Sequence, residues 1–530
     1  MFDVLITGGT VIDGSGAPRR RTDVGVSNGK IQAIGSLGSE PAKRKIDATG
    51  LIVAPGFIDS HCHSDIALVA NPTAPSKVHQ GVTTEIIGNC GWSSYPLSPH
   101  TKESFIRLGK PVFGYPEVQW DWKDLPTYFA QLNAQGTSVN VGSLIGHGAV
   151  RAAVMDFDDR APTLAELSQM CQLVEEGMAA GALGISTGLS YPPGVYAKTD
   201  ELTALSKVVA RHGGIYATHL RDQVDHLEES VEEALTIGRG AGVSVLISHH
   251  KTSGPRNFGK VRSTLRMLEN ARAEGLKTHS DMYPYIAGAT TMLMLLPPWI
   301  FDSGHEALLA RLADPKVRQT LLRNWQEGIP GWENRVGAIG WESITISYVA
   351  TEKNRDVEGL TVPQAAARRG KSIVDFLCDL LVEERGEVGQ ILQNSCEQDM
   401  LMVMLHPNSM VGSDGIDVGE RPHPRQYDTF PKILGELVRE REVMSLETAI
   451  HKMTGYTAKA FNLAGRGLVK EGFHADLAIF DPTTIQSRST FQKPRQYPVG
   501  IEWVMLNGKF TLDAGKLTGE LSGSTLRRSS

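Results

Sequence analysis

The stretch "LIVAPGFIDSHCH", residues 51–63, decides the fold of this chain. It is a mostly apolar run that ends abruptly in two histidines, His61 and His63. A short apolar run of this kind is typical of a strand buried on both faces in a parallel sheet. In barrels built from such strands, the carboxyl end of each strand carries the chemistry. We therefore expect a strand here whose end belongs to a functional site.

Seven further segments have the same character, and helical stretches such as "TLAELSQMCQLVEEGMAAG" (163–181) separate them. The predicted strands are 82–90, 139–147, 182–190, 214–220, 243–250, 277–285 and 409–415. Strands that alternate with helices indicate βα units around a parallel sheet. Eight repeats favour an α/β fold, the (β/α)8 or TIM barrel.

The two ends of the chain have a different, β-rich character. Short strand-like runs surround Gly-Gly, Asp-Gly and Asn-Gly turn signals in "DVLITGGTVIDGSG" (3–16) and "GIEWVMLNGKFTLDAGK" (500–516). We predict that residues 1–54 and 465–530 form one small β-domain beside a barrel of residues 55–464. The last predicted strand is preceded by a long connection, in which we expect an insertion at about 286–345 that covers the barrel mouth as a lid.

Composition narrows the classes of partner. The 530 residues are 41% hydrophobic and 21% charged, as in ordinary globular proteins, and the net charge of −6 gives no basic excess for nucleic acid. Five widely spaced cysteines favour reduced thiols over a disulfide framework. Because no stretch approaches the ~20 apolar residues of a membrane span, we expect a cytoplasmic protein without a membrane partner. The sequence leaves the oligomeric state open.

Metal-binding residue types gather at the predicted strand ends. They are His61, His63, Cys90, His219, His249, His250 and Asp414. Two residues apart on a strand, His61 and His63 face the same side and suit one divalent metal; the alternative is two separately hydrogen-bonded histidines. Imidazole and thiolate together favour zinc, and a thiolate can bridge two metals.

Two details of this set stay open on the residues alone. Alternation along 243–250 places His249 on a face with valine and isoleucine, and His250 on a face with serines. The pattern therefore does not decide which of the two histidines faces the site. Asp414 could be a further ligand, the general base, or both.

The motifs together resemble the amidohydrolase superfamily, and within it the D-aminoacylase or N-acyl-D-amino-acid deacylase family. They are "VAPGFIDSHCH", "GNCG", "GLSYPPGVYAKTDEL", "ATHLRD", "ISHHK" and "GSDG…PHPRQYDTFP". The resemblance covers almost the whole chain and implies that the β-rich ends form a β-sandwich. Dihydroorotases and hydantoinases instead place a modified lysine on the fourth strand, whereas "ALGISTGLS" here contains none. One departure is Ser64, which stands where the family commonly has an acidic residue and bears on the occupancy of a second metal site.

The resemblance assigns roles to individual residues. It implies a tightly held zinc on Cys90, His219 and His249. It also implies a second, weaker site, with Cys90 bridging, on His61, His63 and Asp414. The residues implied to bind substrate are Lys251, Tyr283 and Arg425, which hold its α-carboxylate; His147 or Tyr283 would help to polarise the scissile carbonyl.

The function implied is zinc-dependent hydrolysis of N-acyl-D-amino acids, small-molecule substrates, with water activated by the metal and Asp414 as general base and acid. One alternative is hydrolysis of another amide, a cyclic amide or a carbamate at the same site. A remote alternative is a non-catalytic structural relative of the barrel. An acidic substrate side chain would need an arginine from the insertion, where Arg311, Arg318 and Arg323 lie in a helical run.

Overall fold

The computed structural model describes residues 1–115 and 117–528; position 116 of the predicted barrel domain and the last two residues of the predicted C-terminal segment lie outside the described residues. At its centre is an eight-stranded parallel sheet whose neighbours follow the order of the chain. Its strands are β8 (Phe57–Asp59), β9 (Val82–Ile87), β10 (Asn140–Gly146), β11 (Gly184–Gly188), β12 (Ile215–His219), β13 (Ser244–Ile247), β14 (Thr278–Met282) and β18 (Ser409–Val411).

The first and last strands of this sheet meet along a line that we call the seam. The Ser60 amide donates to the Val411 carbonyl at 3.2 Å, and the His63 amide donates to the Gly415 carbonyl at 3.0 Å. Because these bonds join β8 to β18, the sheet closes on itself. The predicted (β/α)8 barrel is therefore confirmed.

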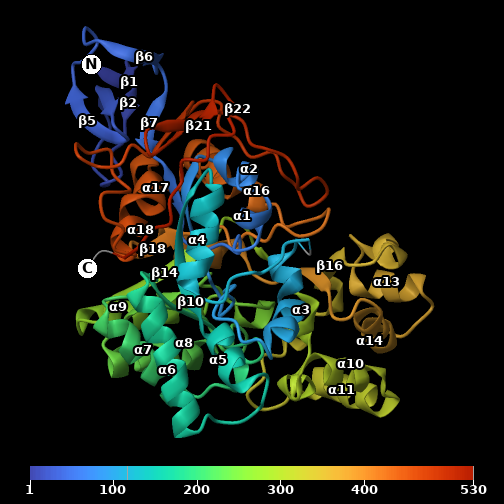
Figure 1. Ribbon diagram of the computed structural model, residues 1–530. Coiled ribbons are helices and arrows are strands. Elements are labelled where there is room, and N and C mark those ends of the chain that lie inside the picture. Colours follow the sequence, from blue (N-terminus) through green and yellow to red (C-terminus); the bar gives the residue numbers. More distant parts are fainter. Residues whose placement is uncertain (116, 529–530) are drawn as a thin grey trace.

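Helices follow the strands and cover the outside of the barrel (Figure 1). They include α5 (His147–Met155), α6 (Leu164–Ala179), α7 (Thr199–Arg211), α8 (Leu227–Ala241), α9 (Val261–Ala273) and α16 (Arg425–Lys432). Their starts are encoded locally: Thr163 and Glu166 form a capping box that satisfies the first amides of α6. Across residues 1–115 and 117–528, no helix combines the length and the apolar character needed to cross a lipid bilayer.

The two chain ends form a β-sandwich, at the top of Figure 1 in blue and red. One sheet has the order β5 (Lys30–Gly35), β4 (Asp23–Ser27), β1 (Phe2–Thr7) and β6 (Ala42–Asp47). The other has the order β22 (Lys516–Leu517), β21 (Lys509–Asp513), β20 (Ile501–Leu506), β19, β7, β2 (Thr10–Val11) and β3 (Arg20–Arg21). In the second sheet β7 (Ile52–Pro55) pairs antiparallel with β19 (Leu477–Phe480), which joins the two ends of the sequence. Buried side chains of both sheets, among them Ile6 and Ile479, share one core. The predicted small β-domain is present.

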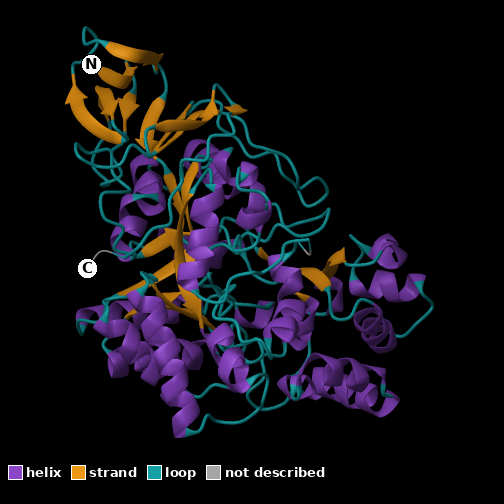
Figure 2. Cartoon of the chain, viewed as in Figure 1, coloured by secondary structure: helices purple, strands orange, loops and turns teal. Residues whose placement is uncertain are grey.

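Between β14 and β18 the chain leaves the barrel and builds a separate layer. A three-stranded antiparallel sheet has the order β15 (Ala287–Thr291), β17 (Val388–Gln393) and β16 (Ile344–Val349). Its helices α10 (Gly304–Ala313), α11 (Pro315–Glu327), α13 (Val362–Arg368) and α14 (Ile373–Glu383) stand to one side of the barrel (Figures 1 and 2). The predicted end of the insertion, near residue 345, falls inside β16. The three-stranded sheet is completed only by β17, so the insertion extends beyond the predicted end.

Phe57 ties three parts of the molecule together. Its fully buried ring stacks on Phe430 of α16 at a centroid distance of 5.6 Å and lies 6.3 Å from Phe480 of β19. One side chain of the first barrel strand thus contacts both the helix after the last strand and the sandwich.

We expect Phe57→Ala to lower the free energy of unfolding by about 3–5 kcal/mol, because it leaves a cavity where these three parts meet. Urea denaturation followed by fluorescence measures this loss. Phe258→Ala, at a phenylalanine that is 38% exposed, is the matched control and should change the free energy little. Equal effects of the two substitutions would contradict this account of the junction.

Candidate metal centre and active site

Three candidate ligands lie just beyond the strands that carry them, on unusual backbone. Cys90, His249 and Asp414 follow the last residues of β9, β13 and β18 by two or three positions. Their φ angles are 53°, 36° and 49°, in the left-handed region that residues other than glycine rarely adopt. Such conformations cluster at functional sites, where the surroundings hold them in place. Each side chain therefore turns into the mouth of the barrel rather than continuing the alternation of its strand.

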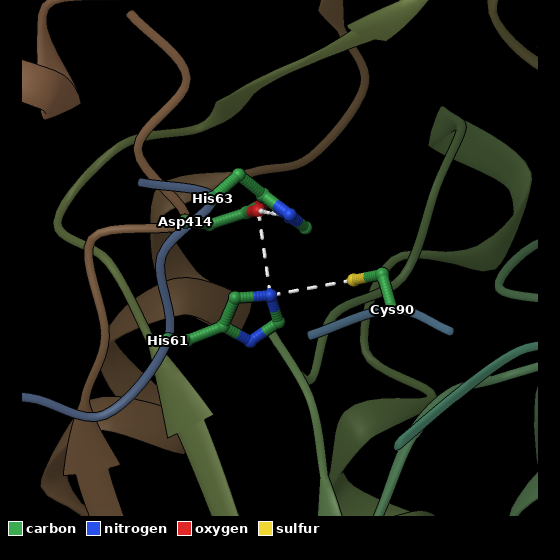
Figure 3. Close-up of side chains that lie close together, drawn as sticks. All are labelled: His61, His63, Cys90 and Asp414. Atoms are coloured by element: carbon green, nitrogen blue, oxygen red, sulfur yellow. Dashed lines mark hydrogen bonds and ion pairs between the residues drawn. The ribbon is translucent and has the colours of Figure 1, made fainter. Parts of the chain in front are cut away.

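The candidate ligands converge on the Cys90 thiol and the Asp414 carboxylate (Figure 3). Cys90 Sγ lies 3.3 Å from His61 Nε2 and 3.5 Å from His249 Nε2. Asp414 Oδ1 lies 3.3 Å from His63 Nε2 and 3.5 Å from His61 Nε2. All five residues are buried.

These side chains form two overlapping groups of donors. One is His61, His63, Cys90 and Asp414, and the other is Cys90, His219 and His249; within each group the ligand atoms lie within 4.8 Å of one another. Burying a thiol, a carboxylate and four imidazoles together is unfavourable unless a cation or a proton compensates the charge. The mixture of sulfur, nitrogen and oxygen donors fits Zn²⁺. Cys90 belongs to both groups and is placed to bridge two ions.

The electrostatics of the cluster favour the metal-binding forms of Cys90, Asp414 and His249. Burial raises the pKa of the Cys90 thiol, but its interactions with the His61 and His249 imidazoles outweigh burial and hold this pKa well below its usual range. Burial likewise acts against ionisation of Asp414, yet Arg425 and His63 keep its pKa well below the ordinary value. Burial also holds the pKa of His249 well below its usual range, so this imidazole stays neutral. Thiolate, carboxylate and neutral imidazole are the states that donate to a metal.

Against the effect of burial, Asp281 and Cys90 raise the pKa of His61 well above its usual range. In the same way, Asp414 and Cys90 raise the pKa of His63 to about 9. A metal ion would therefore displace a proton from each of these two imidazoles.

Two residues that sequence reasoning missed orient the histidines. Asp281 of β14 places Oδ2 3.3 Å from His61 Nδ1, and its Oδ1 accepts the His249 backbone amide at 2.6 Å. Gln223 Nε2 lies 3.2 Å from His249 Nδ1. In both imidazoles Nδ1 is engaged, so Nε2 faces the cluster. The sequence signal for Asp281 was its place as the acidic residue in the predicted strand "KTHSDMYPY".

A narrow cavity opens on the cluster. Lys251 and Tyr283 line it, as the sequence predicts for substrate-binding residues. Arg425 lies behind them: its guanidinium stacks 4.5 Å from the Tyr283 ring centroid, and Nη1 lies 2.9 Å from Asp414 Oδ2. Burial lowers the pKa of Lys251 to about 7, against the attraction of Asp414.

The structure separates two other histidines from this cavity. His147 is not among the described residues that line it; its Nε2 lies 2.8 Å from Glu201 Oε1, in a buried pair at the start of α5. His250 points away and its Nε2 lies 2.8 Å from Thr264 Oγ1. The open choice between His249 and His250 is thus resolved in geometry, with His249 beside Cys90.

The insertion contributes an arginine that sequence reasoning did not single out. Arg335, in α12 (Arg335–Ile339), lines the cavity, and its Nη2 lies 3.4 Å from His219 Nε2. Its charge is paired with Glu333 at 2.7 Å. Arg311 instead donates to the Ile300 carbonyl, and Arg318 pairs with Asp375 and Asp379. No local pattern marks Arg335, because it reaches the cavity only through the fold of the insertion.

Comparison with known proteins agrees with this fold and cluster. Residues 44–512 match the profile of the Amidohydrolase family. The chain belongs to this family, and within it to the D-aminoacylase branch. It is 38% identical to a D-aminoacylase of Alcaligenes xylosoxydans xylosoxydans over 99% of this chain and 98% of that protein. The resemblance drawn from the motifs is confirmed.

Two solved structures are similar over the whole chain. One is an N-acyl-D-glutamate deacylase from Bordetella bronchiseptica, complexed with zinc and a phosphonate that mimics the tetrahedral intermediate; the TM-score is 0.84 at 36% identity, covering 99% of each chain. The other is a D-aminoacylase described as having a binuclear metal centre, with one-metal activation and second-metal attenuation; the TM-score is 0.84 at 36% identity, covering 100% of each chain.

We expect Asp281→Asn to weaken Zn²⁺ binding about 10- to 100-fold, because it loosens both His61 and the backbone of His249. Calorimetric titration of the metal-free protein measures the affinity. Asp428→Asn is the matched control, since this buried carboxylate accepts the Arg488 amide at 2.6 Å and touches none of the candidate ligands. Wild-type affinity in Asp281→Asn would refute its orienting role.

Proposed function

We propose that this chain is a zinc-dependent hydrolase that cleaves the N-acyl amide bond of N-acyl-D-amino acids, releasing a carboxylate and a free D-amino acid. The observation that carries the proposal is the position of Cys90, whose sulfur belongs to both donor groups at the wall of a cavity lined by Lys251 and Tyr283. The family membership and the named activities of the similar proteins support the same reaction.

The proposed tight zinc site consists of Cys90, His219 and His249. The weaker site consists of His61, His63 and Asp414, with Cys90 shared. Cys90 Sγ lies close to Nε2 of both His61 and His249, which supports the sharing of its thiolate between the two sites. Zinc bound there would polarise the scissile carbonyl and lower the pKa of a coordinated water toward ~7.

Asp414 is the proposed general base and acid. Its carboxylate is ionised at neutral pH, lies between His63 and Arg425, and lines the cavity. It takes a proton from the attacking water and hands it to the leaving nitrogen. Arg425 keeps the carboxylate in place from the side away from the histidines.

The substrate α-carboxylate is proposed to bind near Lys251, Tyr283 and Arg425. Lys251 Nζ lies 5.5 Å from the Tyr283 ring centroid, on the cavity wall next to the metal cluster. The Lys251 ammonium supplies a point charge and the Arg425 guanidinium a planar fork. With the carboxylate fixed on one side and the carbonyl at the metal cluster, the positions of the side chain and the hydrogen on Cα distinguish D from L.

A substrate panel tests the reaction. We expect hydrolysis of N-acetyl-D-amino acids, with the L enantiomers and a set of hydantoins and dihydropyrimidines cleaved at least about 100-fold more slowly, a difference of ~2.7 kcal/mol in transition-state binding. Release of the free amino acid is measured after loading the protein with Zn²⁺. Preferred cleavage of the cyclic amides would favour the alternative specificity on the same site. A zinc-loaded protein that cleaves none of them would refute the proposal.

Asp414→Asn should keep the tight zinc and lose turnover by about 10²- to 10⁴-fold, because proton transfer is removed while Cys90, His219 and His249 remain. Metal content and kcat are measured on the same preparation. Asp417→Asn is the control: this carboxylate pairs with Arg495 at 3.0 Å and is not a cavity residue within the described part of the chain. Full activity in Asp414→Asn would exclude the assigned role.

A further inference from the structure

A second buried polar cluster lies directly behind the metal centre. Lys77, in the short helix α2 (Pro75–Val78), is 1% exposed. Its Nζ donates to Asp59 Oδ2 at 2.6 Å and to Ser413 Oγ at 2.9 Å, and lies 3.3 Å from Glu85 Oε1. Asp59, Cys62 and Glu85 also form a group that could hold a metal ion, but the Lys77 ammonium already contacts both of its carboxylates. The cluster therefore has its own cation and is not a further metal site.

Asp59 connects this ammonium to both sides of the seam. Its Oδ1 accepts the Ser413 amide at 2.8 Å and the His61 amide at 3.3 Å, while its Oδ2 accepts the Ser413 hydroxyl at 2.6 Å. Asp59 and His61 belong to the first strand and its end, whereas Ser413 follows the last strand. One carboxylate thus binds the backbone just before Asp414 and the backbone of His61.

The Ser413 hydroxyl extends the same network around Asp414. The Gly415 amide donates to it at 3.0 Å, and the Asp414 amide donates to the His61 carbonyl at 2.7 Å. These bonds hold Asp414 at its left-handed φ of 49°. Ser64, directly after His63, donates to Glu85 Oε1 at 3.0 Å, so the cluster also reaches the second histidine of the first strand.

The proposed weaker metal site straddles this seam. His61 and His63 come from one side and Asp414 from the other, so their spacing depends on how the seam is closed. By contrast, the tight site takes Cys90, His219 and His249 from the ends of β9, β12 and β13, none of which forms the seam. Apart from the shared Cys90, the two sites therefore depend on different parts of the barrel.

We infer that Lys77 is a positioning residue for the second metal: through Asp59 and Ser413 it sets the distance between the first-strand histidines and Asp414. The inference rests on the proposed function only for the two metal sites. It makes a selective claim, namely that loss of Lys77 weakens the seam site and spares the tight site.

The experiment is a calorimetric titration of Zn²⁺ into metal-free full-length protein, which resolves the two binding steps. In Lys77→Met we expect the first step unchanged and the second weakened about 10- to 100-fold. Ser413→Ala, which keeps the ion pair and removes only the hydroxyl, should weaken the second step less. Lys77→Met/Asp59→Asn keeps the net charge of the cluster and removes a possible ligand, so it should show the same selective loss without metal uptake by Asp59.

Lys452→Met is the matched control. Lys452 is another buried lysine, which donates to the His406 carbonyl and, at 3.2 Å, to the Ser409 carbonyl at the opposite end of β18. It should leave the ratio of the two affinities unchanged. If it lowers the second affinity as Lys77→Met does, the effect is general destabilisation and the inference is overturned.

Three other results separate this inference from the proposed function. If both Zn²⁺ binding steps keep their wild-type affinities in Lys77→Met and in the double variant, the role of Lys77 is overturned and the proposed function stands. A wild-type protein that takes up one ion only would also overturn the inference alone. A wild-type protein that binds no zinc would overturn the proposed function with it.

Discussion

The closure of eight parallel strands is the constraint on which the rest of this molecule depends. Parallel strands end at the same edge of a sheet, so closing the sheet brings eight strand ends to one small ring. Here that ring gathers a thiol, four imidazoles and a carboxylate, all of them buried. Such a set is unfavourable without charge compensation. The geometry that makes the barrel therefore also creates the demand for a cation at its mouth.

The ring is held in a conformation that the strands alone would not give. Cys90, His249 and Asp414 have left-handed backbone, which costs about 1–3 kcal/mol at each such residue. Specific bonds maintain it: the His249 amide donates to Asp281 Oδ1 at 2.6 Å, and the Asp414 amide donates to the His61 carbonyl at 2.7 Å. The first bond joins the neighbouring strands β13 and β14, whereas the second crosses the seam. The conformation of Asp414 therefore depends on the closure of the barrel.

The sequence predicted those features of the fold and of the candidate site that follow from the local pattern of apolar and polar residues. The order of the eight strands, the β-rich ends and the convergence of His61, Cys90 and Asp414 all come from apolar runs that end in polar residues. The alternation of side chains along a strand did not predict which of His249 and His250 faces the site. The reason is that β13 ends at Ile247 and His249 has left-handed backbone, so the geometry of a strand no longer applies there. Arg335 reaches the cavity only through the fold of the insertion and has no local signature, whereas the only signal for Asp281 was its place as the acidic residue of a predicted strand. His147 lay at a predicted strand end, but α5 begins there and turns its ring toward Glu201.

The insertion is part of the site rather than a cover laid over it. Glu333 Oε1 accepts the Gln223 amide at 2.9 Å and its Oε2 accepts the Ser190 hydroxyl at 3.0 Å, so it binds the loops after β12 and β11. The Gln223 side chain in turn contacts His249 Nδ1. Displacing the insertion would therefore disturb a candidate zinc ligand as well as open the cavity. Because Glu333 also neutralises Arg335, this arrangement lines the cavity with an arginine without adding net positive charge beside His219. The insertion thus shapes the substrate cavity and supports the metal cluster through the same buried carboxylate.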